Sequence, residues 1–520
     1  MVLGALGLVI VLAVGAAAGY AWYLNHKVHR INVNGLSDAS SSGADQGTQN
    51  ILMVGSTSRC ALTQQNAAYG LCSQGVTGVN SDVVMILHLN PATHTVSILS
   101  IPRDLFVPNA RKEGANKIDA ALVEGPSQLV AAVQEDLGIP INHYVELNFD
   151  TFANVVNALG GVKMYFPEPV YDAYSGLNVQ TPGCLTLNGF QALQVVRARH
   201  LQYTAPGVTA TNPADWPQET QSDLARIRRD HEFLRVLATA ISKKGLGDPL
   251  TDQQIVSSVV SQLTVDRGFS ASDMVNMVLN YHSVNPDAAP QLTMPVAVGN
   301  FGTYYYEGGN YGDIEFPAEP QDQQSVNSFL GISNTTNSMT GQPLPSPSSI
   351  SVQVVNGTGV TDQAAQTSQA LQALGFHVAG LGDASAVGAE AETVVYYAAN
   401  TPSDLAAAQT VARSISGAAI MAQDASEVPA GANVTVVTGT DFAVATPAPA
   451  TTTATTATTA TTAKGSKATT TTVAPTTTTT TTTTASSSSP SSEFSAPTPK
   501  TEALAPWDPR SCTPSGGEGP

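Results

Sequence analysis

Two arginines lie two residues apart in a stretch that is otherwise apolar and rich in amides. They are Arg197 and Arg199, within the run LNGFQALQVVRARHLQY. A planar guanidinium binds phosphate or carboxylate oxygens through two parallel hydrogen bonds, so two neighbouring arginines can hold one anion. A helix is predicted from Asn188 to about residue 193, and the β-branched pair that follows predicts a strand from Val195. Alternate residues of a strand share one face, so both arginine side chains are predicted to project to the same side. The alternative to an anion site is that both are surface residues that form ordinary salt bridges.

The chain is acidic overall, and its cationic residues are concentrated in one region. Its 520 residues carry 22 Lys and Arg against 40 Asp and Glu, a formal net charge of −18. This balance does not suit sequence-independent binding of nucleic acid phosphates, which argues against a DNA-binding attenuator. Fourteen of the 22 cationic residues lie between Arg59 and Lys244, which indicates either a local anion site or a solvated charged surface.

The elements that must position these arginines follow an α/β pattern over residues 50–320. An apolar run at 51–54 predicts a strand, and two apolar runs within 83–101 are separated by a turn at Asn90-Pro91. Such a pair predicts adjacent antiparallel strands. Helical patterns follow at 127–137 and 150–159, and the second ends at two glycines.

A long amphipathic helix is predicted from Ser222, whose side chain suits an N-cap position. Its buried stripe is expected to contain Leu224, Ile227, Leu234 and Ile241. Arg226, Arg229 and Asp230 lie on a neighbouring face. This helix therefore adds Arg226 and Arg229 to the cationic residues of the predicted α/β domain.

The rest of the chain divides into an anchor, a second domain and a stalk. Residues 2–24 are apolar and free of charge, which predicts an N-terminal transmembrane anchor within 1–30, with a cleaved signal peptide as the alternative. Residues 350–443 alternate strand-like and helical runs, which predicts a small second α/β domain. Residues 444–520 are dominated by Thr, Ala, Ser and Pro, which predicts a disordered stalk and tail. Its end, with Trp507 and Cys512, is expected either to stay disordered or to dock.

Seven short motifs, in order, resemble the LytR-CpsA-Psr family of cell-wall glycopolymer transferases. They are NILMVGSTSR at 50–59, NSDVVMIL at 80–87, SIPRDL at 100–105, NKIDAA at 116–121, ALGGV at 158–162, LNGFQALQVVRARH at 187–200 and SDLARIRRDHEFLR at 222–235. In addition, VQVVNGTGV, ALGFHV and VVTGTDF in the second domain resemble the LytR C-terminal domain of actinobacterial members. The resemblance implies a three-layer α/β/α domain with a mixed sheet.

The resemblance also implies a reaction and a site. Members of the family transfer a glycosyl phosphate from a polyprenyl-pyrophosphate-linked glycopolymer to peptidoglycan, with Mg²⁺ and with the lipid in an apolar tunnel. By position, the catalytic residues would be Arg197, Arg199 and Arg226, the substrate-binding residues Arg103, Lys117, Arg229 and Asp230, and the metal ligands Asp82 and Thr57. The bulk of the chain would lie outside the cell membrane, attached by a single span.

Three positions depart from the family pattern. Thr57 stands where an acid is expected, Asn80 where an arginine is expected, and Asp230 where a glutamine is expected. Threonine offers magnesium a neutral oxygen but no charge. The alternative function is therefore a non-catalytic envelope regulator that binds polyprenyl pyrophosphate without turning it over.

The four cysteines indicate disulfides, because their spacing lacks a zinc pattern. Four cysteines allow three pairings. If this part of the chain lies outside the cell, Cys60 and Cys72, which are close in sequence, are expected to form a disulfide. Closing the loop between them would stabilise the fold by on the order of 3 kcal/mol. Cys184 and Cys512 would then remain, which favours a docked tail.

Overall fold

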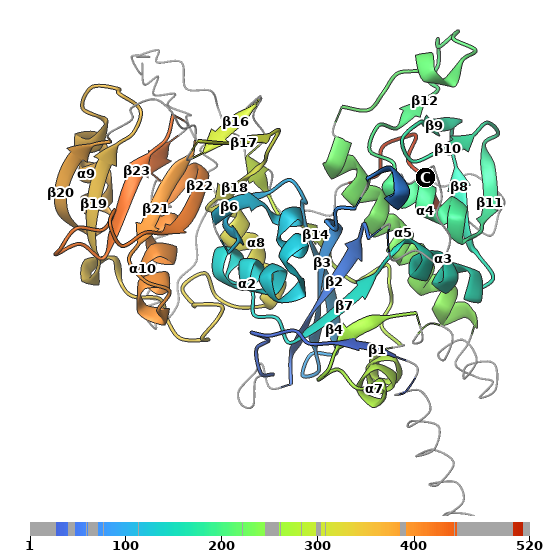
Figure 1. The fold of residues 1–520 in the computed structure, drawn as a ribbon, viewed down its shortest axis with the longest axis horizontal. Coiled ribbons are helices and arrows are strands. Elements are labelled where there is room, and N and C mark those ends of the chain that lie inside the picture. The colour runs from blue at the N-terminus through green and yellow to red at the C-terminus, as the bar shows by residue number, and fades with distance from the viewer. Residues whose placement is uncertain are drawn as a thin grey trace, which may run out of the picture. The chain divides into compact units, whose positions relative to one another are not determined.

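The computed structural model describes the chain in separate stretches (Figure 1). They are residues 26, 28–39, 47–58, 60, 71–75, 77–112, 114–220, 222–244, 259, 262–281, 283–297, 303–306, 308–384, 392–440, 442–444 and 503–512. The predicted anchor at 2–24 and the Thr-rich stretch at 446–495 lie outside the described residues. Within the described residues, none of the helices combines the length and the apolar character that a membrane span needs.

A seven-stranded mixed sheet carries the predicted α/β domain. Its strand order is β1 (His29–Ile31), β13 (Thr264–Asp266), β7 (His143–Leu147), β2 (Gln49–Ser56), β3 (Ser81–Asn90), β4 (Thr95–Ile101) and β14 (Gln291–Thr293). β3 pairs antiparallel with β2 and β4, whereas β7 is parallel to β2. The predicted antiparallel pair is confirmed, and the Asn90 side chain accepts hydrogen bonds from the backbone of the turn between β3 and β4.

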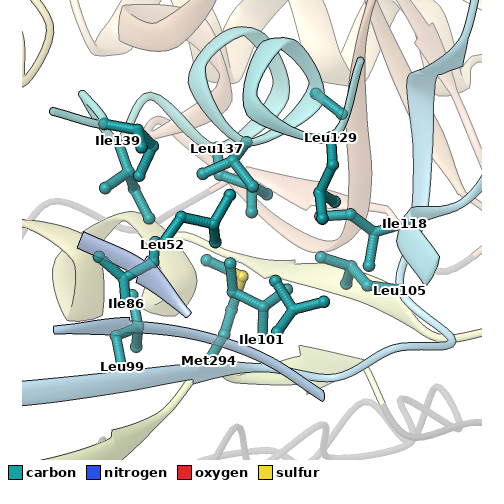
Figure 2. Packing of buried hydrophobic residues seen from close by; sticks show 14 of the residues in the cluster. Leu52, Ile86, Leu99, Ile101, Leu105, Ile118, Leu129, Leu137, Ile139 and Met294 are labelled. Atoms are coloured by element: carbon teal, nitrogen blue, oxygen red, sulfur yellow. The ribbon is translucent and has the colours of Figure 1, made fainter. Parts of the chain in front are cut away.

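One face of this sheet packs against helices α2 (Pro126–Leu137) and α8 (Gln321–Leu330). Alternate residues of the central strands point to this side because side chains of a strand alternate between faces. They are Leu52, Val54, Val84, Ile86, Leu99 and Ile101. Figure 2 shows Leu129 and Leu137 of α2 facing this apolar layer. Each fully buried leucine contributes roughly 1.5–3 kcal/mol, so this layer holds the strands in register.

The side chains of the intervening strand residues lie on the opposite face of the sheet. This face is covered by α5 (Ser222–Lys244) and α7 (Ala271–Tyr281). Met53 and Leu87 of the strands line the same cavity as Leu234 of α5 and Met277 of α7. Helices therefore lie on both sides of a mixed sheet, and the predicted three-layer α/β/α class is confirmed.

A second apolar cluster forms where α5 meets α3 (Phe149–Ala158) and α4 (Gly189–Arg197). It also includes the strands β8 (Val162–Phe166) and β11 (Gly183–Leu187), and β8 pairs with β25 (Arg510–Ser511) from the end of the chain. Helices α3 and α4 approach closely at Gly189, where a Cβ atom would overlap the backbone carbonyl of Ala153. The remaining strands of this domain are β5 (Phe106–Arg111), β6 (Gly114–Lys117), β9 (Val170–Asp172), β10 (Leu177–Val179), β12 (Gln202–Tyr203), β16 (Tyr304–Tyr306) and β17 (Gly309–Gly312).

The second α/β region contains two more described strands than the four strand-like runs of its sequence, SVQVV, TVVYYA, AAIMA and VTVVTG, indicate. Its elements are β19 (Ser351–Asn356), α9 (Gln363–Ala373), β20 (His377–Asp383), β21 (Thr393–Tyr397), α10 (Pro402–Ala412), β22 (Ile415–Gln423), β23 (Val434–Thr438) and β24 (Ala443–Val444). Strand β20 escapes the pattern because Gly380 and Gly382 interrupt its apolar residues. The sheet continues into β18 (Phe316–Glu319) and β15 (Val296–Ala297), since β18 pairs antiparallel with β22.

Candidate functional site

A cavity of about 350 Å³ opens beside the end of β2, the start of β3 and the starts of α3 and α5. Four arginines line it, namely Arg103, Arg197, Arg199 and Arg226, together with the carboxylates Asp82 and Asp230. The rest of its wall is largely apolar, with residues such as Met53, Phe149, Phe152, Phe233 and Leu234. The cavity therefore combines a cationic patch with an apolar lining.

Arg197 and Arg199 reach this cavity by a different route from the predicted one. Helix α4 begins at a capping box between Asn188 and Gln191 and continues to Arg197, so the prediction of a strand from Val195 is wrong. The capping box and the burial of Val195 outweigh the strand preference of β-branched residues. The helix ends at Ala198, whose backbone is extended, and this change of direction returns Arg199 to the side of Arg197.

Each of these arginines is held by a specific neighbour. The guanidinium carbon of Arg197 lies 4.6 Å from the centre of the Phe149 ring, a cation–π contact. Arg199 donates from Nη2 to Oδ2 of Asp104 at 2.9 Å, and its Nε lies 3.2 Å from Oδ1 of Asp223. Both guanidiniums are thus fixed in the cavity wall.

Helix α5 supplies Arg226 and Asp230, one turn apart and both almost fully buried. Nη2 of Arg226 lies 3.0 Å from Oδ1 of Asp223, and its Nε lies 3.7 Å from Oδ2 of Asp230. Burial raises the pKa of Asp230 to about 8, because it outweighs the opposing effect of Arg226. Asp230 is therefore a carboxyl group that exchanges its proton near neutral pH.

A second ion-pair cluster lies where β3 and β4 meet this wall. Arg103 pairs with Asp82, and its Nε lies 3.5 Å from Oδ2 of Asp104. Lys117 donates from Nζ to Oδ1 of Asp104 at 2.8 Å. Although burial opposes the change, Arg103 and Lys117 lower the pKa of Asp104 below its usual range. Asp104 thus connects Arg103, Lys117 and Arg199.

Three of the predicted site residues do not line the cavity. Lys117 lies behind Asp104, while Arg229 is completely buried between Glu219 and Asp508. Thr57 is also buried, and its Oγ1 accepts a hydrogen bond from the backbone N–H of Asn80 at 2.9 Å.

The two departures at 57 and 80 contact each other. The backbone N–H of Thr57 donates to the carbonyl of Asn80 at 2.9 Å, in return for the bond to its hydroxyl. The Asn80 side chain also donates to Oδ2 of Asp119 at 3.2 Å. A neutral pair thus occupies the two positions at which the resemblance implies an acid and an arginine.

The donor set for magnesium is small. In the part of the chain that the structure describes, no three His, Cys, Asp or Glu side chains are grouped so that they could hold a metal ion. Mg²⁺ commonly takes only one or two carboxylates and completes its octahedron with phosphate oxygens and water. Asp82 in the cavity wall suits this arrangement, so the residues fit a magnesium ion that is bound together with a phosphate ligand.

Two acids of the site could not be predicted from the sequence. Asp223 is buried in the first turn of α5 and contacts both Arg199 and Arg226. Burial, followed by the nearby charges of Asp223 and Asp104, raises the pKa of Glu315 to about 8. The only local signal was the position of Asp223 at a helix N-terminus, where acids are common.

An apolar cavity of about 440 Å³ adjoins the first one and shares Met53 and Leu234 with it. It lies between the sheet and helices α5 and α7, and its lining includes Leu87, Leu237 and Met277. Two disulfides are present: Cys60–Cys72, which is the predicted pair, and Cys184–Cys512, whose pairing the sequence left open. Residues 503–512 therefore dock on the domain instead of remaining disordered.

The chain matches two family models and is similar to several known proteins. The chain matches the model described as "LytR_cpsA_psr family" over residues 20–312, and the model described as "LytR cell envelope-related transcriptional attenuator" over residues 349–442. It is 35% identical over 271 residues to the "Probable cell wall biosynthesis protein LcpB" of Corynebacterium glutamicum. The aligned stretch covers 51% of this chain and 59% of that protein. It is 26% identical over 416 residues to the "Cell wall biosynthesis protein LcpA" of the same organism, with 72% and 73% covered.

The chain is also similar to a transferase from Bacillus anthracis and to a solved structure from Actinomyces oris. The chain is 30% identical over 195 residues to the polyisoprenyl-teichoic acid–peptidoglycan teichoic acid transferase TagU of Bacillus anthracis, covering 36% of this chain and 57% of TagU. It thus spans less than two thirds of the length of LcpB and of TagU. Among solved structures, the "LytR-Csp2A-Psr enzyme from Actinomyces oris" aligns with a TM-score of 0.45 and 24% identity, covering 59% of this chain and 97% of that one.

Proposed function

Because the chain belongs to the LytR-CpsA-Psr family, we propose that it transfers a glycosyl phosphate from a polyprenyl-pyrophosphate-linked glycopolymer to peptidoglycan. The observation that carries this proposal is the pair of adjoining cavities, one lined by four arginines and the other apolar. A polyprenyl pyrophosphate has the same two parts, a doubly charged headgroup and a long apolar chain. The name of TagU supports a polyisoprenyl-linked donor and a peptidoglycan acceptor, and the names of LcpB and LcpA support a role in cell wall biosynthesis.

Charge neutralisation is the main task of such a site. A peptidoglycan hydroxyl oxygen forms a bond to the phosphorus that carries the glycan, while the bond from that phosphorus to the bridging oxygen breaks. The bridging oxygen leaves with the polyprenyl phosphate and takes the negative charge. Phosphoryl transfer needs positioning and charge stabilisation more than covalent help. Arg197, Arg199 and Arg226 would bind these oxygens bidentately, and all three line the same cavity.

The attacking hydroxyl must lose its proton, and Asp230 is the proposed acceptor. It lines the cavity beside Arg226, and burial raises its pKa to about 8. Its ionised form is consequently a stronger base than an ordinary carboxylate, and general bases work best with a pKa near the working pH.

Magnesium, membrane attachment and an extracytoplasmic location belong to the same proposal. Asp82 would hold Mg²⁺, and the ion would neutralise charge on the pyrophosphate oxygens. Residues 2–24 would anchor the chain in the cell membrane, on the side where its lipid-linked substrate is presented. The two disulfides support an oxidising compartment outside the cytoplasm.

The second candidate function is a non-catalytic receptor for polyprenyl pyrophosphate. The observation that favours it is Thr57, which uses its hydroxyl in a bond to Asn80 and brings no charge to a metal. One feature argues against the receptor. Thr57 and Asn80 are both neutral where the resemblance implies an acid and an arginine, so the net charge implied for these two positions is unchanged. The two functions share the ligand and differ only in turnover.

The discriminating experiment measures polyprenyl phosphate release from a radiolabelled lipid-linked glycan, using the full chain in detergent with magnesium and a peptidoglycan acceptor. Arg226→Gln removes one buried charge-assisted contact, and the rate is expected to fall about 100-fold. Arg111→Gln is the matched control, because Arg111 pairs with Glu124 at 3.8 Å and lies outside the cavity. Wild-type binding without release would favour the receptor.

A further inference from the structure

The described C-terminal segment, residues 503–512, lies outside both family matches and packs on the domain that holds the site. Figure 1 shows this segment, in red, beside β8 and α5, and β25 pairs antiparallel with β8. The ring of Trp507 stacks on Tyr203 with centroids 3.7 Å apart, and Cys512 is bonded to Cys184. The segment is thus fixed by several independent contacts.

Asp508 is the buried charge of this segment. It is completely inaccessible to solvent, and it accepts hydrogen bonds from Nε of Arg228 at 2.6 Å and from Nη1 of Arg229 at 3.3 Å. Its Oδ2 also accepts from the backbone N–H of Ala505 at 2.7 Å. Burying a carboxylate is costly unless it is paired and hydrogen-bonded, so this geometry binds Asp508 closely to α5.

Arg229 connects Asp508 to Ala198, which lies between the two cavity residues Arg197 and Arg199. Its guanidinium lies between two acids, with Nη2 2.7 Å from Oε1 of Glu219 and Nη1 3.3 Å from Oδ1 of Asp508. Nη2 also donates to the backbone carbonyl of Ala198 at 2.5 Å. Ala198 is the residue between Arg197 and Arg199, at the point where α4 ends and the chain changes direction.

We propose that Asp508 is a positioning residue for the pyrophosphate site: it fixes Arg229, which holds the carbonyl of Ala198 and so orients Arg197 and Arg199 in the cavity. The inference rests on the proposed function for the identity of the ligand. It assigns a role in that site to a segment more than 300 residues away from these arginines in the sequence.

The positioning role is separable from simple docking of the tail. The Trp507–Tyr203 stack, the disulfide and the β25–β8 pairing hold the segment on the domain through partners other than Arg229 and Ala198. Loss of one of these contacts should loosen the tail. Loss of the Asp508 charge should instead change the orientation of the arginines while the tail stays attached.

The test uses calorimetric titration of the full chain in detergent with two ligands of equal chain length, geranylgeranyl pyrophosphate and the uncharged geranylgeraniol. Asp508→Asn keeps the size of the side chain and removes its charge. Its affinity for the pyrophosphate is expected to fall roughly three- to thirty-fold, while its affinity for the alcohol stays at the wild-type value. Trp507→Phe, the matched control, is expected to lower Tm and to leave both affinities unchanged.

Two results would overturn the inference. One is an Asp508→Asn protein that binds the pyrophosphate as tightly as wild type. The other is a loss of affinity for both ligands, as a general loosening of the fold would give. If wild type binds neither ligand, the proposed function fails, and the inference fails with it.

A second variant keeps the inference testable if Asp508→Asn does not fold. Arg229→Lys retains the positive charge between the two acids but lacks the planar fork that also reaches Ala198. The same selective loss for the pyrophosphate is expected, and its absence in a folded protein would contradict the inference.

Discussion

Asp230→Asn is expected to make the stability of this protein less sensitive to pH between about 5 and 8. Burial raises the pKa of Asp230 from 3.8 to about 8 in the folded chain, against the opposing effect of Arg226. The folded state therefore binds this proton more tightly than the unfolded state. The contribution to stability is fully present below the unfolded pKa and is lost as the pH rises through the folded pKa.

The size of the effect follows from the pKa difference. One proton held only by the folded state changes the free energy of unfolding by about 1.4 kcal/mol per pH unit. Between pH 5 and 8 this gives at most about 4 kcal/mol, and an effective dielectric constant of about 20, which applies even to buried groups, reduces it to about 2–4 kcal/mol. For a domain of this size, that corresponds to a difference in Tm of roughly 4–16 °C.

The assay compares Tm at pH 5, 6.5 and 8 for wild type, Asp230→Asn and the control Asp313→Asn, which replaces an exposed carboxylate. Burial raises the pKa of Asp119 to about 6 and that of Glu315 to about 8. Both residues are present in all three proteins, so their effects on Tm cancel when a variant is compared with wild type. The Tm advantage of Asp230→Asn should grow as the pH rises. The wild-type rate of polyprenyl phosphate release should also increase through pH 8, and the variant should lose this dependence.

Parallel pH profiles for wild type and Asp230→Asn would refute this reasoning. Such a result would mean that Arg226 keeps Asp230 ionised across the whole range, in spite of its burial. Asp230 would then be an ordinary ion-pair partner, and its proposed role as proton acceptor would be withdrawn.

Three further outcomes are expected. Phe149→Leu removes the ring 4.6 Å from the guanidinium carbon of Arg197, and calorimetry should show a roughly two- to thirty-fold loss of affinity for geranylgeranyl pyrophosphate. Met53→Trp fills the junction of the two cavities, so titrations should show weaker binding of geranylgeranyl pyrophosphate and little change for the five-carbon dimethylallyl pyrophosphate. Asp82→Asn should raise the magnesium concentration needed for half-maximal release of polyprenyl phosphate by about ten-fold or more, while chelation of magnesium should stop release by wild type.

Local patterns were sufficient wherever a residue's position depends on its near neighbours. Strands β3 and β4 follow from their apolar runs and the Asn90-Pro91 turn, and the fold class and family follow from motifs in their order. Arg226 and Asp230 share a side of α5 because residues four apart in a helix are one turn apart. The pairing of Cys60 with Cys72 follows from their closeness in the sequence.

Only the tertiary structure decided what these residues face. Helix α4 continues through Val195 because the capping box and burial outweigh the local strand preference, and Arg199 returns to the cavity only because the helix ends at Ala198. Asp223 became a partner of Arg199, and Asp508 a partner of Arg228 and Arg229, through contacts between separate segments of the chain. The sequence by itself determined most of the elements and the kinds of charge that this protein carries, since both depend largely on local periodicity and composition. Which charges meet was decided by packing, because the free energy of burying an ion depends on every group that surrounds it in three dimensions.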